Sequence, residues 1–445
     1  MATTEFNFDG LVGPTHNYAG LSHGNVASIK HQHAVSSPRT AALQGLAKMK
    51  FVRDLGIEQA VLPPLQRPNL SFLRQIGFSG SDTDIVQKAN KVDPVLVAVC
   101  FSASNMWTAN AATVSPSPDT PDNRLHLTPA NLTTNLHRAL EAGSTTAVLK
   151  SVFFNQDHFA VHQPLHSAAA LSDEGAANHT RLCSTFGGPG LELFVYGCEF
   201  LNRSRPRPKK FPARQTLESC QALARRHGLP DEQIKLIHQN PNAIDAGVFH
   251  NDVISVGHQN VLLCHQWAFV DQEKCIQEIK SQFNQICGAD LHVVSLSNDE
   301  LPISDAVSSY LFNSQLVTKS DGNLALICPT ECQQNKNAST CIQKIISETN
   351  PISEVHFLDL RQSMNNGGGP ACLRLRIVLS PDEQAAMHQK VRLTDELYHQ
   401  LYEWVEKHYR ESLAPEDLLD PKIIEESAAA FDDLATILEI PINEI

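Results

Sequence analysis

The sequence lacks the apolar segments that would place a protein in a membrane or direct it to export. No stretch reaches 18 uninterrupted apolar residues, the length that indicates a transmembrane helix. The first residues, Met-Ala-Thr-Thr-Glu-Phe, contain neither the basic region nor the apolar run of a signal peptide. We therefore expect no membrane partner, no cleaved leader and a cytoplasmic location.

A surplus of basic residues is missing too. The chain has 48 Asp and Glu against 35 Lys and Arg, for a net charge of −13. Proteins that bind nucleic acid usually carry a basic footprint, so we expect no nucleic-acid partner. An anionic small substrate stays compatible with this charge, because a few well-placed arginines decide such binding locally.

Several catalytic and metal-binding motifs are absent. The chain has no G-x-G-x-x-G or Gly-Lys-Ser/Thr phosphate loop, no G-x-S-x-G nucleophile elbow and no H-E-x-x-H zinc motif. The pairs Cys328/Cys332 and His158/His162 have no second ligand pair at a suitable distance. These absences argue against a phosphate loop, a serine hydrolase and a structural zinc site.

The cysteines do not form a disulfide framework. There are 11, an odd number, and no Cys-x-x-Cys pair occurs among them. In a chain without an export signal, such cysteines are typical of reduced, mostly buried thiols.

Helical and strand-like segments alternate along the 445 residues, a length that would by itself suggest two or three domains. Ser37 and Pro38, for example, suit the N-cap and first position of a helix. The patterns predict helices at 37–49, 133–142, 212–227, 272–286 and through most of 381–438. They predict strands at 147–154, 191–196, 246–249, 261–263 and 324–327.

An internal repeat favours one fold made of similar units. Residues 248–263 align with 311–326 at an offset of 63 without a gap, and 152–157 echo the start of the pattern. Each long copy has the pattern of strand, polar turn and strand, followed by a segment compatible with a helix. Copies of a ββαβ-like unit would explain this.

The clearest candidate for chemistry is Cys372, which ends the run Met364-Asn365-Asn366-Gly367-Gly368-Gly369-Pro370-Ala371-Cys372. An alternating strand, 373–379, follows. A thiol at a junction between a glycine loop and a strand is a candidate nucleophile, because ligand and backbone can approach it closely. The three glycines would leave room for a substrate group against the backbone.

A proton-transfer group is the second requirement, and His250 could supply it. His250 is predicted to end a strand, and Asp252, two residues on, would then share its face. Glu174, in the run 171–179, could orient a histidine or grip a cation. A structural histidine and an acidic helix start are the alternatives. Glu174, His250 and Cys372 can form one site although they are distant in sequence.

The N-terminal segment 10–25 is rich in glycine and small polar residues. This composition suits a loop that wraps a polar ligand, and an irregular surface loop is the alternative.

Four motifs together carry a family resemblance: Gly13-Pro14-Thr15-His16-Asn17-Tyr18-Ala19-Gly20-Leu21, residues 173–179, residues 245–252, and residues 365–372. With these motifs the chain resembles the N-succinylarginine dihydrolases of the pentein superfamily over nearly its whole length. The resemblance implies an α/β pentein fold, a pseudo-five-fold propeller of ββαβ units around a central active-site cavity. It implies a single catalytic domain over 1–445, no metal or organic cofactor, and a homodimer.

The resemblance also implies a reaction and roles. N2-succinyl-L-arginine and two waters would give N2-succinyl-L-ornithine, two ammonia and carbon dioxide, a step of arginine catabolism. Cys372 would attack the guanidinium carbon, its thiol pKa lowered by His250 or by the cationic substrate. His250 would transfer protons, Glu174 would orient His250 or hold the guanidinium, and Asp252 would pair with guanidinium nitrogens.

The residues expected around the substrate are Ala19, Gly20, Leu21, Ser22, His23, Gly24, Asn25, Val26, Ala27, Ser28, Asn110, His137, Arg138, Arg214, Asp252 and Asn366. For Arg138 and Arg214, both in segments predicted as helices, a solvated surface role is the alternative. Other functions also stay open: a deiminase, a dimethylarginine hydrolase, an amidinotransferase, or a propeller scaffold without catalysis.

Overall fold

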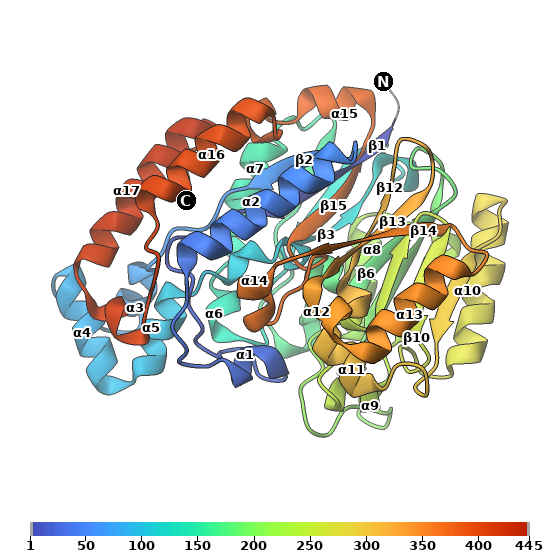
Figure 1. Cartoon of the computed structure of the whole chain (residues 1–445), viewed down its shortest axis with the longest axis horizontal. Coiled ribbons are helices and arrows are strands. Elements are labelled where there is room, and N and C mark those ends of the chain that lie inside the picture. The colour runs from blue at the N-terminus through green and yellow to red at the C-terminus, as the bar shows by residue number, and fades with distance from the viewer. Residues whose placement is uncertain (1–2, 443–445) are drawn as a thin grey trace.

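The strands of the computed structural model, which describes residues 3–442, form five sheets of three strands each. Figure 1 shows the sheets at the centre of the molecule with helices around them. In chain order the strands are β1 Thr4–Gly10, β2 Glu58–Leu62, β3 Ala112–Ser115, β4 Leu125–Pro129, β5 Phe159–Val161, β6 His179–Cys183, β7 Gly190–Tyr196, β8 Ile234–His238, β9 Ser255–His258, β10 Val261–His265, β11 His292–Leu296, β12 Gln315–Thr318, β13 Leu324–Pro329, β14 Ile352–Leu358 and β15 Arg374–Leu379.

The helices connect and cover these sheets. They are α1 Val26–Lys30, α2 Pro38–Asp54, α3 Leu70–Gln75, α4 Asp82–Val92, α5 Pro94–Phe101, α6 Leu136–Ala139, α7 Ala142–Val152, α8 Leu217–Arg226, α9 Pro241–Asp245, α10 Gln272–Cys287, α11 Ile303–Ser309, α12 Thr330–Gln334, α13 Lys336–Ser347, α14 Arg361–Asn365, α15 Pro381–Ala386, α16 Asp395–His408 and α17 Lys422–Leu438.

All five sheets share one pattern. The middle strand pairs antiparallel with one neighbour and parallel with the other, as β10 does with β9 and β11. Parallel neighbours need a long crossover, and helices supply it in every unit; α10, for example, joins β10 to β11. Each unit is therefore a ββαβ motif, as the repeat indicated.

The first unit is assembled from both ends of the chain. Strand β15 pairs antiparallel with β1, from Thr4 opposite Leu379 to Asp9 opposite Arg374. Strand β1 in turn pairs parallel with β2. This pairing closes the ring of five units.

One strand from each unit faces the centre of the ring. Contacts between units are made by β15 with β3, by β6 with β9, and by β9 with β12. The inner strands are therefore β3, β6, β9, β12 and β15, and they surround a common axis.

Apolar side chains fill the space between the inner strands and the helices. Phe6 and Phe8 of β1 are fully buried, and Phe8 packs on Phe153 beyond the end of α7. The C-terminal helices belong to this packing: α16 lies against α2 and α17, as Figure 1 shows. Trp404 of α16 donates a hydrogen bond to the carbonyl of Ala430 at 2.8 Å.

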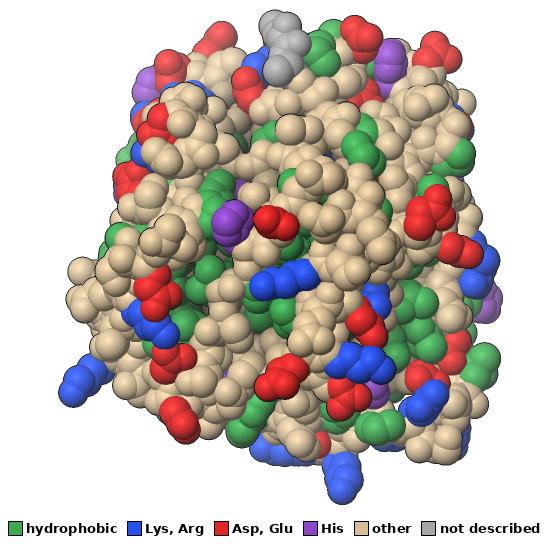
Figure 2. Space-filling view, turned by 90° about the vertical axis from the view of Figure 1, so that its right-hand side faces the viewer, with side chains coloured by type: hydrophobic (Ala, Val, Ile, Leu, Met, Phe, Trp, Pro, Cys, Tyr) green, Lys and Arg blue, Asp and Glu red, His purple; other side chains and the backbone are tan. Residues whose placement is uncertain are grey.

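The surface carries both signs of charge. On the face shown in Figure 2, acidic and basic side chains are interspersed over a largely neutral surface. None of the helices within residues 3–442 is long and apolar enough to cross a membrane.

Two predicted strands are wrong. Residues 147–154 belong mostly to α7, where Val148, Leu149 and Val152 share one buried helical face. Gly143 lies inside this helix and does not end one. Residues 246–249 follow the short helix α9, and Gly247 turns the chain with φ +108°. In both cases β-branched and aromatic residues favoured a strand, but tertiary packing decided otherwise.

The repeat holds between elements, although its ungapped offset does not. Strands β9 and β12 begin 60 residues apart, at Ser255 and Gln315, whereas β10 and β13 begin 63 apart. The turn 319–323 is longer than the turn 259–260, which accounts for the difference. The echo at 152–157 is wrong, since those residues end α7 and enter a loop.

Candidate active site

The candidate residues meet at one end of the ring axis. A short turn precedes each inner strand, and each turn carries one or more polar groups of the site. These are Asn110 before β3, Glu174 before β6, His250 and Asp252 before β9, Asn313 before β12, and Cys372 before β15. The site thus takes a contribution from every unit.

Cys372 lies at the expected junction between the glycine loop and β15, and it is buried. Its Sγ is 3.4 Å from Oδ2 of Asp252. Its backbone N–H donates to Oδ1 of Asn313 at 3.2 Å, and the Asn313 side-chain amide donates to the carbonyl of Asp252 at 3.2 Å. Asn313 therefore ties the thiol and the carboxylate together.

The three glycines make room for protein side chains. A Cβ at Gly367 would lie 2.0 Å from the Asn25 amide, and one at Gly368 would lie 2.1 Å from Nε1 of Trp107. A Cβ at Gly369 would lie 2.7 Å from Oδ1 of Asn313. The expectation that this space is left to the substrate is wrong, because Asn25, Trp107 and Asn313 already occupy it.

His250 and Glu174 form a buried pair. Nε2 of His250 is 2.8 Å from Oε2 of Glu174. His250 does not end a strand; it has an extended backbone and caps the short 3-10 helix Asn251–Val253, which contains Asp252. This turn, and not a strand face, brings the imidazole and Asp252 into one region.

Glu174 is fixed through its other polar groups as well. Thr134 donates to Oε1 at 2.5 Å, Asn110 donates to the carbonyl at 2.7 Å, and the backbone N–H donates to Gln215 at 2.7 Å. Both carboxylate oxygens are thus engaged, one by Thr134 and one by His250.

Burial and neighbouring charges set the ionisation of the acids and the thiol. Burial would raise the pKa of Glu174, but the hydrogen bond and charge of His250, with Arg214 and Arg138, lower it to about 2. Burial raises the pKa of Asp252. Burial, and next the Asp252 carboxylate, raise the pKa of the Cys372 thiol well above its usual range.

The expected substrate-binding cations lie around Glu174. Arg138 and Arg214 are both buried, so the surface alternative is wrong for them. Arg138 contacts Glu141 at 3.0 Å and Asn110 at 3.4 Å. His137 is also buried, and its pKa is lowered well below the usual value by burial and by the charges of Arg138 and Arg214.

Arg214 lies ahead of α8 and not within a helix, since α8 begins at Leu217 after the Thr216 N-cap. Its guanidinium lies over the ring of Phe249, 4.7 Å from the centroid. One guanidinium nitrogen donates to Ser22 Oγ at 3.1 Å and to the His23 carbonyl at 2.7 Å. Arg214 thereby links the site to segment 19–28.

Segment 19–28 also reaches the glycine loop. The Asn25 amide donates to the Gly367 carbonyl at 3.2 Å, and Ser28 donates to Oδ1 of Asn366 at 3.3 Å. Asn366 donates in turn to the Asn17 carbonyl at 3.0 Å. The segment thus bridges the surroundings of Arg214 and of Cys372.

The remaining residues of this segment set its backbone conformation and its packing. Gly20 and Gly24 adopt positive φ angles, and Val26 and Ala27 begin α1 after the Asn25 N-cap. Leu21 packs on the apolar cluster of α3 to α5, and Ala19 adjoins Tyr18 near the same helices.

Sequence reasoning missed several residues that shape the site, namely Asn313, Thr134, Gln215 and Trp107. The ungapped repeat sets Asn313 opposite His250, but the 60-residue offset between β9 and β12 sets it opposite Val253, so the repeat gave no valid signal for it. Thr134 and Gln215 gave no signal either, because they come from connections outside the repeat. Within residues 3–442 no group of three or more His, Cys, Asp or Glu side chains is arranged to hold a metal ion.

Comparison with known proteins decides the family. A model of the succinylarginine dihydrolase family matches residues 2–443. The chain belongs to this family. The N-succinylarginine dihydrolase of Shewanella loihica is 53% identical over 99% of this chain and 98% of that protein. That of Pseudoalteromonas translucida is 52% identical, with the same coverage.

Solved structures share the fold of this succinylarginine dihydrolase family member. The N-terminal domain of ArgZ, an arginine dihydrolase from the ornithine-ammonia cycle in cyanobacteria, superposes with a TM-score of 0.50 at 16% identity. The match covers 84% of this chain and 97% of that one. AgrE with ornithine and NAD+ gives 0.51 at 16% identity, over 88% of this chain and 40% of that one. The fold is the pentein fold that the resemblance implied.

Proposed function

We propose that the chain converts N2-succinyl-L-arginine and two waters to N2-succinyl-L-ornithine, two ammonia and carbon dioxide. It is a hydrolase of arginine catabolism that acts on the C–N bonds of a linear amidine. The convergence of Cys372, Asp252, His250 and Glu174 at one end of the ring carries this proposal. The other family members, identical at about half of all positions, carry that activity in their names.

The first step is attack of the Cys372 sulfur on the guanidinium carbon. Asp252, 3.4 Å from Sγ, pairs with the guanidinium nitrogens and so holds the carbon beside the thiol. Burial and Asp252 raise the thiol pKa, so the arriving cation is what favours the thiolate. The nucleophile is therefore activated by the substrate it attacks.

His250 transfers the protons. It protonates the departing ammonia and then deprotonates the water that resolves the covalent adduct. Glu174 is engaged through both oxygens, by His250 and Thr134, which favours the role of orienting the imidazole over that of gripping the guanidinium. A second round at the ureido group releases the second ammonia and carbon dioxide.

The substrate's two carboxylates need cationic or amide partners. Arg214 is free to contribute, because its Nε has no hydrogen-bond partner within residues 3–442. Arg138 and His137 lie close enough to add charge, and Asn110, Asn366 and residues 19–28 complete the surroundings. We propose these residues as the substrate-binding set.

The decisive experiment counts ammonia. Purified protein given N2-succinyl-L-arginine should release close to two ammonia per substrate consumed, and Cys372→Ser or His250→Ala should abolish release while circular dichroism stays unchanged. Cys275→Ser, on the outer helix α10, is the matched control and should keep full activity.

Other outcomes would identify the alternatives. One ammonia with a ureido product would indicate a deiminase, and equal turnover of free arginine would refute the succinyl specificity. Full activity of the Cys372 variant would disprove the assigned nucleophile.

We also propose a homodimer, as the resemblance implied, and a location in the cytoplasm, as the lack of an export signal led us to expect. The molar mass measured by light scattering after size-exclusion chromatography should then be twice the 48.9 kDa of one chain. A mass of one chain at working concentration would reject the dimer.

A further inference from the structure

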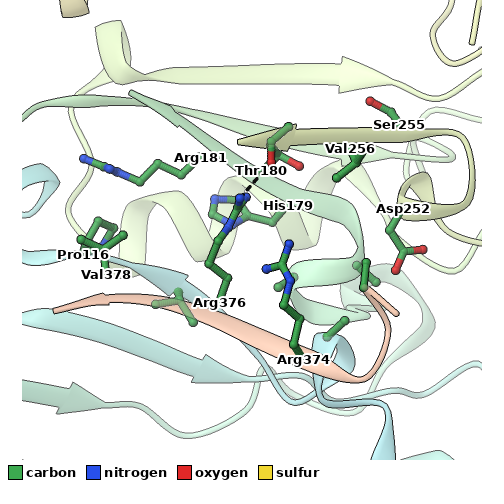
Figure 3. Close-up of a pocket in the computed structure, with 16 residues that line it drawn as sticks. Pro116, His179, Thr180, Arg181, Asp252, Ser255, Val256, Arg374, Arg376 and Val378 are labelled. Carbon is green, nitrogen blue, oxygen red and sulfur yellow. Dashed lines mark hydrogen bonds between the residues drawn. The ribbon is translucent and has the colours of Figure 1, made fainter. Parts of the chain in front are cut away.

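A cavity lies on the ring axis behind the Cys372–Asp252 pair. Its volume is about 80 Å³, which is room for several water-sized groups. Figure 3 shows its walls: β15 carries Arg374 and Arg376, β6 carries His179 to Arg181, and Asp252 stands at one end. Of the residues that line it, only Asp252 takes part in the steps proposed above.

The charged side chains of the lining are mainly basic. Three arginines face the cavity, against a single acid, Asp252. Two of the arginines have partners: Arg181 pairs with Asp119, and Arg376 donates to the Gly257 carbonyl at 2.9 Å and contacts His258.

Arg374 is different. Only 7% of its surface is exposed, yet its guanidinium makes no hydrogen bond or ion pair within residues 3–442. Each acid that attracts it pairs with another group: Glu5 with His258, Asp9 with Lys48, and Asp252 with Cys372. One carboxylate oxygen of each acid is left without a hydrogen bond within residues 3–442, yet none of the three acids bonds to Arg374. Figure 3 shows its side chain rising from β15 into the cavity.

A buried arginine without a partner is costly, so its donors need acceptors from outside the chain. A guanidinium presents a planar fork that matches a planar oxyanion with two parallel hydrogen bonds. The cavity offers further donors in the hydroxyls of Thr180 and Ser255, which also line it. The volume restricts the ligand to a few heavy atoms.

We propose that this cavity binds a small planar oxyanion of the bicarbonate type, held by the Arg374 guanidinium. The choice of bicarbonate rests on the proposed function, since carbon dioxide released by the reaction hydrates to that anion. The anion site itself rests only on the geometry. Because the cavity adjoins Asp252, which contacts Cys372, a bound anion adds negative charge near the thiol. That charge disfavours the thiolate and so slows turnover without occupying the substrate site.

The site can be located directly. Crystals of the full chain soaked in sodium bromide should show an anomalous peak in contact with the Arg374 guanidinium. The peak should persist in Arg374→Lys, which keeps the charge, and vanish in Arg374→Gln. Water alone at this place in the wild type would overturn the proposal. The wild-type crystal tests the proposal even if the Gln variant fails to fold.

A measurement in solution tests whether the anion binds only at the high concentration used to soak the crystal. Sodium nitrate, a planar oxyanion, should raise the melting temperature of the wild type above that in equal sodium gluconate, which is too large for the cavity. The difference should be lost in Arg374→Gln and kept in Arg226→Gln, a surface arginine on α8. Equal melting temperatures in nitrate and gluconate would refute the site.

Inhibition separates the anion site from its assigned ligand. Bicarbonate should lower kcat, about twofold at its own dissociation constant, with little change in KM for succinylarginine. Nitrate binding without bicarbonate inhibition would keep the site and reject bicarbonate as its ligand. Purely competitive inhibition would place the anion in the substrate site and overturn the proposal.

Discussion

At the residue scale, the Glu174–His250 pair serves folding as well as chemistry. A carboxylate buried among Thr134, Asn110 and Gln215 keeps its charge only because a histidine and two arginines stand close to it. The arrangement that orients the catalytic imidazole therefore also makes the folded state depend on the ionisation of one acid.

This dependence has a sign and a pH window. The Glu174 pKa falls from its ordinary 4.5 to about 2 in the folded protein. A lowered pKa stabilises the folded state above pH 4.5, and the stabilisation is lost as the pH falls toward 2. Between pH 5 and pH 3 the wild type should lose about 2 kcal/mol more than Glu174→Gln in free energy of unfolding.

Urea titrations at the two pH values measure this difference. Glu403→Gln, which changes an exposed acid on α16, should lose as much stability as the wild type over the same range. Parallel behaviour of the wild type and Glu174→Gln would show that the pair does not hold the Glu174 charge.

At the element scale, the loop ahead of β15 is shaped by side chains that press on its glycines. Trp107 approaches Gly368 so closely that a methyl group has no room, and its indole N–H donates to Ser363, in the helix α14 just before the loop, at 3.1 Å. The position of Cys372 depends on this packing, because the loop leads directly into it.

Gly368→Ala should therefore displace the loop. We expect a loss of about 1–3 kcal/mol in stability, as for overpacked sites, and a fall of at least tenfold in kcat. Gly143→Ala is the matched control: it lies in α7 with no atom within 4 Å of an added Cβ, and should leave activity unchanged and stability equal or higher. Full activity of Gly368→Ala would show that the loop tolerates displacement.

At the scale of the whole molecule, closure of the ring joins segments from both ends of the chain. Strand β15 pairs with β1, and Tyr409, after α16, donates to the Val12 carbonyl at 2.5 Å. Helix α16 packs on α2 as well. These contacts support the proposal that residues 381–438 belong to one catalytic domain with the ring.

The three tryptophans can test that proposal, since Trp107 lies by the glycine loop, Trp267 after β10 and Trp404 in α16. We would make three variants, each of which keeps one tryptophan and carries Phe at the other two positions. In each variant, the urea midpoint from tryptophan fluorescence should equal the midpoint from far-ultraviolet circular dichroism. A separate transition for Trp404 would mean that the C-terminal helices form a domain of their own.

The patterns of the sequence were reliable where local signals and packing agree. The helices α2 and α10 and the strands β7, β10 and β13 follow from caps, glycines and apolar runs. The sequence patterns gave the wrong structure at 147–154 and 246–249, where residues that favour strands are buried on a helix or in a turn. Arg138 and Arg214 could not be placed, because burial of a charge depends on partners from distant segments.

By itself, the sequence determined the repeated ββαβ unit, the family, and the Cys, His and carboxylate groups, because these depend on local pattern and on motifs. Only the tertiary structure decided that the polar turn ahead of each inner strand points to one end of the axis. Five units closed by β15 and β1 bring those turns together, and no single unit contains the site. The same closure leaves Arg374, two residues beyond Cys372, facing the cavity on the axis, a consequence of ring geometry that no local pattern records.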